Sequence, residues 1–386
     1  MTMLRAIHLT SIEQLRASAS AWDDLWWRSD VALPTTRAEL IAQWIERFCP
    51  KSVFHAIAVE ADGRWIAALP LVGRRVGWVL PAGDLPSNEW SPCGELLLDA
   101  STDTDAALDL LLAATDCLPW QMLWLNDTIP DSPRWRAMLH ACNRAGLLSA
   151  HHHRYRVGRV EIGRDWGAYL RHLRKGHRQN MHRVARRLDA EGRVQLETCS
   201  EFSPAQVESR LRAAFEIEDQ GWKGAAGTSV LGSPGMFPFF VRQAEQLADW
   251  GQLEFASLRL GHQIIAFVYG YRAKGVFFAH KIGYDPRFAA FSPGQLLFFR
   301  LLERLHNEGS VHALDFMGPL TESLARWQPT TYDVGRIAVA LRHPLGLTAM
   351  YAYKHWWPTI RRLKGELAPP TARPPVESPT AEPVGI

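Results

Sequence analysis

The stretch "LEFASLRLGHQIIAFVYGYRAKGVFFAHKIGYD" (residues 253–285) decides the fold of the second part of the chain. It contains three apolar runs, which are separated by turn signals at Gly261 and at Lys274-Gly275. Runs of this length, rich in β-branched and aromatic residues and bounded by glycine, are typical of strands joined by short turns. The stretch therefore predicts three consecutive antiparallel strands.

The next stretch, "PRFAAFSPGQLLFFRLLERLHNEG" (residues 286–309), predicts a loop followed by a helix from Gly294 to Glu308. The first N–H groups of a helix have no partner within the helix, and the helix dipole adds positive potential there. Since Gly294 has no Cβ, a phosphate could approach these groups closely. The alternative is that Ser292-Pro293-Gly294 is only a helix cap.

The two halves of the chain repeat one order of elements: helices, an antiparallel hairpin, a strand, a helix, a strand, a helix and a strand. We expect helices at residues 12–27, 37–48, 104–116, 132–145, 204–218, 236–250, 294–308, 321–327 and 347–364. We expect the other strands near residues 53–73 (a hairpin), 77–80, 95–98, 121–125, 155–162, 311–316 and 336–341. This order predicts an α/β (α+β) fold with two tandem mixed, largely antiparallel sheets flanked by helices.

The expected boundaries are a first half at residues 1–165, a basic linker helix at 166–200, a second half at 201–365 and a proline-rich tail at 366–386. The tail has too few large apolar residues to order itself and should be disordered. From Arg171 to Arg193, apolar residues fall on one helical face and arginines crowd the others. This segment is either a solvated bridging helix or a helix that faces an anionic partner.

Composition narrows the class of protein. Lys+Arg number 43 against Asp+Glu 40, a net charge of +3, so we do not expect a nucleic-acid binder. The N-terminus does not read as a signal peptide and no apolar run is long enough to span a membrane. We expect a cytoplasmic protein, with peripheral contact to the inner membrane as an alternative. The 16 tryptophans indicate an aromatic core, or alternatively a cleft that binds rings.

Metal and thiol chemistry are not expected. The five cysteines lie far apart and form no CxxC pair, which argues against a zinc site and against disulfides. None is accompanied by a histidine motif for covalent catalysis. His151, His152 and His153 stand on a predicted strand, where consecutive side chains alternate between faces and cannot all reach one ion. We therefore predict no metal.

Three residues are the leading candidates for a catalytic proton acceptor: Asp315, His280 and Glu218. Asp315 ends an apolar strand, where it either faces a ligand or caps the next helix. His280 can exchange protons near neutral pH, although it could equally be a packed core histidine. Glu216, Asp219 and Asp285 are further candidates, and Asp285 before Pro286 is typical of a turn cap.

Four stretches carry a resemblance to a known family. They are "WKGAAGTSVL" (residues 222–231), "GQLEFASLRLGHQIIAFVYGY" (251–271), "GYDPRFAAFSPGQLLFFRLLERLHNEG" (283–309) and "LDFMGP" (314–319). They resemble the CelD/BcsL-type acyltransferases of the GNAT superfamily, which have tandem GNAT-like halves and a FemAB-related architecture. The resemblance covers most of residues 10–345. It implies transfer of an acyl group, most simply acetyl, from acyl-CoA to N or O of a sugar, polysaccharide precursor or similar small acceptor in exopolysaccharide or cellulose-type biosynthesis.

The resemblance also implies which residues form the site. Ser292, Pro293, Gly294 and Gln295 would hold the pyrophosphate of the coenzyme, and the strand with Lys281, Ile282 and Gly283 would line its pantetheine arm. Trp222, Lys223, Tyr284 and Asp285 would contact the acceptor. The first half has the acidic loop "DASTDTD" (residues 99–105) at the corresponding place, which would repel a pyrophosphate. We therefore expect one donor site, in the second half.

One position departs from the family pattern. Relatives commonly carry an aromatic–lysine pair where this chain has Ser323-Leu324, so the role of that lysine is vacant or has moved to Arg326. Two other functions stay open: a FemAB-like transferase that uses aminoacyl-tRNA, or a non-catalytic glycan-binding accessory protein. The expected partners are a small or glycan acceptor and an anionic surface at residues Arg171 to Arg193.

Overall fold

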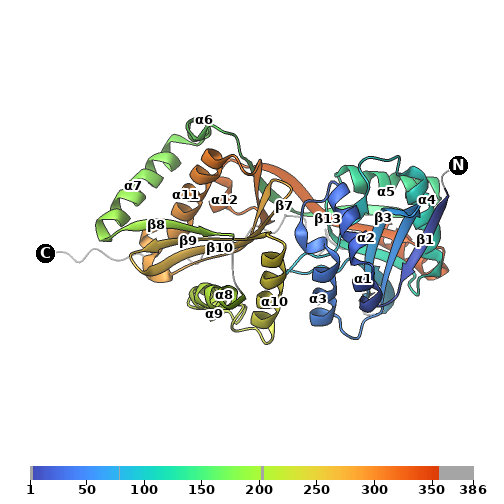
Figure 1. Ribbon diagram of the computed structural model, residues 1–386. Coiled ribbons are helices and arrows are strands. Elements are labelled where there is room, and N and C mark those ends of the chain that lie inside the picture. The colour runs from blue at the N-terminus through green and yellow to red at the C-terminus, as the bar shows by residue number, and fades with distance from the viewer. Residues whose placement is uncertain (1–2, 78, 201–203, 356–386) are drawn as a thin grey trace.

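The computed structural model describes residues 3–77, 79–200 and 204–355, without the side chains of residues 204, 205, 222 and 355 (Figure 1). Its centre is one mixed sheet with the strand order β1-β2-β3-β4-β6-β13-β7-β12-β11-β10-β9-β8, and β5 pairs separately with β3. The strands are β1 (Leu4–Leu9), β2 (Phe54–Ala61), β3 (Arg64–Val76), β4 (Leu80–Asp84), β5 (Leu97–Leu98), β6 (Met122–Thr128), β7 (Ser149–Glu161), β8 (Val194–Cys199), β9 (Leu253–Leu260), β10 (Gln263–Ala273), β11 (Val276–Tyr284), β12 (Ala313–Pro319) and β13 (Thr330–Ala340).

The strand order is symmetrical about the central β7–β13 pair. Going outward, β6 corresponds to β12, β4 to β11, β3 to β10, β2 to β9 and β1 to β8. Pairing is antiparallel throughout except for β4 with β6 and β11 with β12. The mixed α/β fold with a duplicated plan is thus present as expected, but the two expected sheets are joined edge to edge into one.

The last strand of each half pairs with the other half. β13 lies between β6 and β7, and β7 pairs with β12. The sequence did not predict this exchange, because both strands have apolar alternation that fits either sheet. The division of the chain at residues 165 and 201 stays a prediction, and the exchange means that neither half completes its sheet alone.

Helices cover both faces of the sheet (Figure 1). On one face of the second half lie α8 and α10, and α7 and α11 lie on the opposite face. The helices are α1 (Ile12–Ala17), α2 (Ala19–Arg28), α3 (Ala38–Phe48), α4 (Asp105–Ala114), α5 (Pro133–Arg144), α6 (Trp166–His172), α7 (Lys175–Glu191), α8 (Pro204–Asp219), α9 (Trp222–Ala225), α10 (Met236–Asp249), α11 (Pro293–Glu308), α12 (Glu322–Ala325) and α13 (Pro344–His355), with 3-10 turns η1 (Pro34–Thr36), η2 (Thr115–Cys117) and η3 (Pro286–Phe291).

Several boundaries differ from the expected ones. The first expected helix is broken at Ser18 into α1 and α2. The basic linker is not one helix: Leu173 is extended between α6 and α7, and β8 follows α7 as an edge strand. β1 and β8 were missed because short edge strands carry mixed polar residues and no clear alternation. The end of the expected helix 347–364 and the tail 366–386 lie outside the described residues.

One apolar core runs through both halves. It joins α1, α2 and α3 of the first half to α8 and α10 of the second. Trp22, Trp26, Trp135 and Trp327 are among the largest fully buried side chains, so much of the tryptophan content is core. On α7, Met181, Val184 and Leu188 pack against the core under α11 and the arginines point outward. Among the described residues, no helix has both the length and the apolar character needed to cross a bilayer.

Candidate active site

The two central strands of the second half separate after a short pairing. β11 and β12 pair in parallel only from Val276 to Phe278, opposite Ala313 to Asp315. Beyond this point β11 stays with β10 up to Tyr284, and β12 stays with β7. A main-chain edge of β11 at residues 279–284 is therefore left without a partner strand among the described residues. Such an edge can hydrogen-bond an extended ligand that carries amides.

A strand irregularity lies at the start of this gap. Lys281 is opposite Tyr269 and Ala279 is opposite Gly270, so His280 is an extra residue in β11. A β-bulge of this kind turns side chains and main-chain groups away from their regular directions.

The N-terminus of α11 has no side-chain cap. Ser292 is left-handed, with φ 43° and ψ 53°, and its carbonyl accepts from the N–H groups of Gln295 and Leu296 at 3.0 and 3.1 Å. Pro293 is buried and has no N–H to donate. A Cβ added at Gly294 would meet only the Tyr284 ring, at 3.8 Å. No described side chain therefore caps the start of α11, and the Ser292 carbonyl occupies the N–H groups of Gln295 and Leu296.

Two neighbouring elements flank this turn. The amide of Gln295 donates to the Ser323 carbonyl at 3.4 Å, which links the start of α11 to α12. The guanidinium of Arg187 on α7 lies 5.1 Å from the centre of the Phe291 ring, directly before the turn. Arg326, which could replace the family lysine, is half exposed and lies 3.5 Å from Glu322.

The corresponding places of the first half are closed by acidic side chains. Asp84, at the end of β4, accepts from the main-chain N–H and the amide of Asn126 on β6 at 2.8 and 2.6 Å, and also pairs with Arg74. Its carboxylate fills the place where β4 and β6 stop pairing. At the start of α4, Asp103 accepts from the N–H of Asp105 at 3.0 Å.

His280 is held between the two halves. Its Nδ1 lies within hydrogen-bonding distance of the Tyr271 hydroxyl, and it forms a backbone hydrogen bond with Trp90. Burial holds the pKa of His280 well below its usual range, and the ammonium groups of Lys281 and Lys223 lower it further. A neutral imidazole with both sides engaged fits a positioning role better than that of a proton acceptor.

Glu218 is also engaged. Its carboxylate is buried, pairs with the ammonium of Lys223 and accepts from the N–H of Val230 at 3.0 Å. These contacts hold the loop between α8 and α10. The backbone of Trp222 begins α9, and its side chain lies outside the described residues.

Asp315 is the expected candidate with the most unusual environment. It is 3% exposed and accepts from the N–H of Met317 at 2.7 Å and from the Tyr332 hydroxyl at 2.9 Å. Burial raises the pKa of Asp315 from 3.8 to about 6, against the opposing effect of these hydrogen bonds. A carboxylate with this pKa can accept a proton near neutral pH.

The other residues expected at the site lie partly in packed positions and partly at the surface. Ile282 belongs to the core on the α11 side, and a Cβ at Gly283 would lie 2.5 Å from the Phe267 ring, so packing alone requires glycine there. Tyr284 is exposed beside Gly294. Asp285 is buried as the cap of η3 and bonds Arg287 and Gln263, which lowers its pKa.

The side chain of Lys281 points to the α10 side. Its ammonium lies 4.6 Å from the centre of the Trp90 ring and 5.2 Å from that of Phe240. Trp90 comes from the first half, in a loop where Asn88 Oδ1 accepts from the N–H groups of Trp90 and Ser91 at 3.0 Å. Ser91 in turn accepts from Gln243, which accepts from Tyr269 and Tyr271.

A first half that acts as acceptor wall or scaffold was expected from the sequence, but Trp90 was not identified as the residue that reaches the site. The loop signal is local, a tryptophan in "SNEWSP" (residues 87–92), and nothing in it indicates which distant strand it meets.

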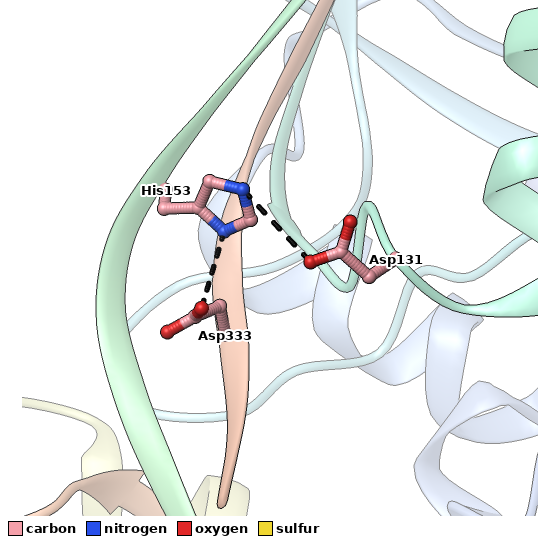
Figure 2. Close-up of side chains that lie close together, drawn as sticks. All are labelled: Asp131, His153 and Asp333. Atoms are coloured by element: carbon pink, nitrogen blue, oxygen red, sulfur yellow. Dashed lines mark ion pairs between the residues drawn. The ribbon is translucent and has the colours of Figure 1, made fainter.

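A histidine and two aspartates meet on the surface between the halves. Figure 2 shows His153 on β7 between Asp131 and Asp333, with Nε2 3.9 Å from Asp131 and Nδ1 3.6 Å from Asp333. The ligand atoms lie within 4.8 Å of one another. The two nitrogens face different carboxylates, and Asp333 also pairs with Arg156 at 3.4 Å. This is the arrangement of an exposed ion-pair network, and we assign no metal to it.

Comparisons with known proteins identify the kind of domain that carries these elements. Residues 175–327, from α7 through α12, match the family model described as acetyltransferase (GNAT) domain. This match places a GNAT acyltransferase domain in the second half, and a domain of this kind makes the protein an enzyme of the acyltransferase class. No curated protein matches the chain in sequence. The narrower resemblance to CelD/BcsL-type proteins stays a prediction.

Solved structures share the fold of nearly the whole chain. The crystal structure of FemX is similar with a TM-score of 0.61 at 11% identity, over 90% of this chain and 100% of that one. The C-terminal domain of a putative lysylphosphatidylglycerol synthetase from Agrobacterium fabrum gives 0.52 at 14% identity, over 88% and 97%. A protein of unknown function from Bacteroides thetaiotaomicron gives 0.51 at 14%, over 88% and 100%. These similarities show the fold alone.

Proposed function

We propose that the protein transfers an acyl group, most simply acetyl, from acyl-CoA to an amine or hydroxyl of a sugar, a polysaccharide precursor or a similar small acceptor. The observation that carries the proposal is the contrast between the halves. In the second half β11 and β12 stop pairing after Phe278 and no side chain caps α11, whereas Asp84 and Asp103 accept from main-chain N–H groups at the corresponding places of the first half. One donor site, in the second half, follows from this contrast.

The open elements fit the parts of coenzyme A. The N–H of Gly294 and the dipole at the start of α11, where no side chain caps the helix, suit the pyrophosphate, and Gly294 lets it approach. The unpaired edge of β11 at residues 279–284 suits the amides of the pantetheine arm. We assign Ser292, Pro293, Gly294 and Gln295 to the phosphates, and the backbone of Lys281, Ile282 and Gly283 to the arm.

The chemistry needs a held acceptor, a proton acceptor and a dipole at the thioester. The acceptor nitrogen or oxygen bonds to the carbonyl carbon, the C–S bond breaks, and the acceptor loses one proton as the coenzyme thiol gains one. We assign the proton transfer to Asp315, because Glu218 is ion-paired and His280 is engaged on both sides. A main-chain N–H at the His280 bulge is suited to bind the carbonyl oxygen.

Hydrogen exchange with coenzyme A tests the proposal. We expect slower exchange at residues 279–284 and 294–297, because bound phosphate and pantetheine cover and stabilise these two main-chain segments. The matched control lies within the same chain: β4 and the start of α4 should show no change. Protection confined to the first half, or none anywhere at saturating coenzyme, would refute the proposed donor site.

A second candidate is a transferase that uses an aminoacyl-tRNA donor, favoured by the outward arginines of α7. It predicts RNA binding that weakens steeply with salt and no protection by coenzyme A.

A further inference from the structure

Within the described part of the chain, the ammonium of Lys281 has no ion-pair partner. Its ammonium is half-buried between the Trp90 and Phe240 rings, and no described carboxylate or hydrogen-bond acceptor lies within bonding distance. Aromatic faces attract a cation, but this attraction offsets only part of the hydration free energy that the ammonium group loses on burial. The pKa of Lys281 is lowered to about 8, first by burial and then by Lys223. A half-buried cation without a described acceptor is typical of a site for an anionic ligand.

The charged groups that act on Lys281 are one ammonium and two carboxylates. Lys223 is the second ammonium, and His280 lies next in the chain on the bulge. The nearest acidic groups are Glu218, which is already paired with Lys223, and Glu89, which is exposed on the first-half loop. Neither carboxylate forms an ion pair with Lys281.

We infer that Lys281, together with Lys223, binds an oxyanion of the acceptor, so that the acceptor carries a carboxylate or phosphate besides its reacting amine or hydroxyl. This inference rests on the proposed function, whose acceptor side it specifies. Lys281 is on the bulged part of β11 and faces α10, while Ile282 faces α11. The oxyanion therefore lies across β11 from the start of α11, where the donor phosphates are assigned. The Trp90 ring from the first half forms one wall of this subsite.

Competitive amine labelling tests the inference without knowledge of the acceptor. The full chain is labelled with acetic anhydride at pH 8, and modification of Lys281 is followed by peptide mass spectrometry. Malonate and inorganic phosphate are the probes, and sodium chloride at equal ionic strength controls for screening. We expect malonate or phosphate at about ten times its apparent Kd to slow labelling of Lys281 about 10-fold, since only about a tenth of the sites are then free. Labelling of exposed Lys51 should not change.

Three variants test the contributions of the two ammonium groups to anion binding. Lys223→Met should raise the probe concentration needed for protection, because one of the two ammonium groups is gone. Lys281→Arg should keep turnover of an anionic acceptor and Lys281→Met should lose it, with the loss mainly in KM. An unchanged labelling rate of Lys281 with both probes would overturn the inference, and Lys281 would then be a structural contact between the halves. Loss of kcat in Lys281→Arg would instead indicate a proton-transfer role and contradict it.

The donor site is tested separately. Coenzyme A should still protect residues 279–284 from exchange in Lys281→Met. If that protection is missing in the unmodified chain, the proposed function fails. If it is present and the anions have no effect at Lys281, only the acceptor inference fails.

Discussion

At the scale of single residues, Asp315 gives the most direct link between environment and chemistry. Its carboxylate must be ionised to accept a proton, so activity should rise with pH through about 6 and level off above it. Asp315→Asn should lower the rate by on the order of 10² to 10⁴-fold, measured as release of free coenzyme A from acetyl-CoA. Tyr332→Phe is the matched control: it removes a hydrogen bond that lowers the pKa of Asp315, so it should keep activity and move the profile to higher pH. An unchanged rate in Asp315→Asn would remove Asp315 from the mechanism.

Asp315 also makes the stability of the protein depend on pH. Its contribution to the free energy of unfolding decreases as the pH rises, whereas the activity is expected to increase. Because its folded pKa is raised, the folded state binds this proton more tightly than the unfolded chain. The stability it contributes is present below pH 4 and is lost as the pH rises through about 6. The free energy of unfolding of the unmodified chain, relative to Asp315→Asn, should therefore fall across this interval. Urea unfolding at several pH values measures it.

At the scale of elements, the sequence predicted what depends on local pattern. The three strands β9, β10 and β11 and the helix α11 were expected nearly at their observed bounds, because alternation, turn signals and helical spacing are read locally. The start of α11 at Ser292-Pro293-Gly294 was also expected, with an anion site and a helix cap as the two alternatives. The separation of β11 from β12 was not predicted, because it depends on which strand β12 pairs with.

The engagement of Glu218, His280 and Trp90 could not be predicted for the same reason. Each partner lies in another element: Lys223 across a loop, Tyr271 on the next strand, and Lys281 from the other half. A sequence without pairing information identifies which residue types could do chemistry. It does not identify which of them already have partners.

At the scale of the whole molecule, the exchanged strands β7 and β13 and a shared core make the halves one unit. Lys274 adds a specific contact, because its ammonium donates to the carbonyl oxygens of Trp26, Ser29 at 2.9 Å and Val31 at 2.8 Å in the first half. The guanidinium of Arg37, directly before α3, lies 3.5 Å from the centre of the Trp250 ring. The site includes Trp90 from the first half, so its geometry depends on these contacts between the halves.

Lys274→Met should destabilise both halves together. It leaves three carbonyl oxygens without their donor, at a cost of about 1–3 kcal/mol in the free energy of unfolding. Equilibrium urea unfolding should show one transition at lower urea, with Lys51→Met, at an exposed turn, as the neutral control. Two separate transitions, of which only one moves, would show that the halves unfold independently.

The central claim is that the open start of α11 binds the coenzyme, and titration calorimetry of coenzyme A against two glycine variants tests it most directly. Gly294 and Gly176 each occupy the second position of a long helix, α11 and α7, and neither has an atom closer than 3.8 Å to an added Cβ. Gly294→Val should weaken binding at least about 10-fold, or about 1.4 kcal/mol, by blocking approach of the phosphate, with unchanged folding. Gly176→Val should bind as the unmodified chain does. Equal affinity in all three proteins would contradict the account.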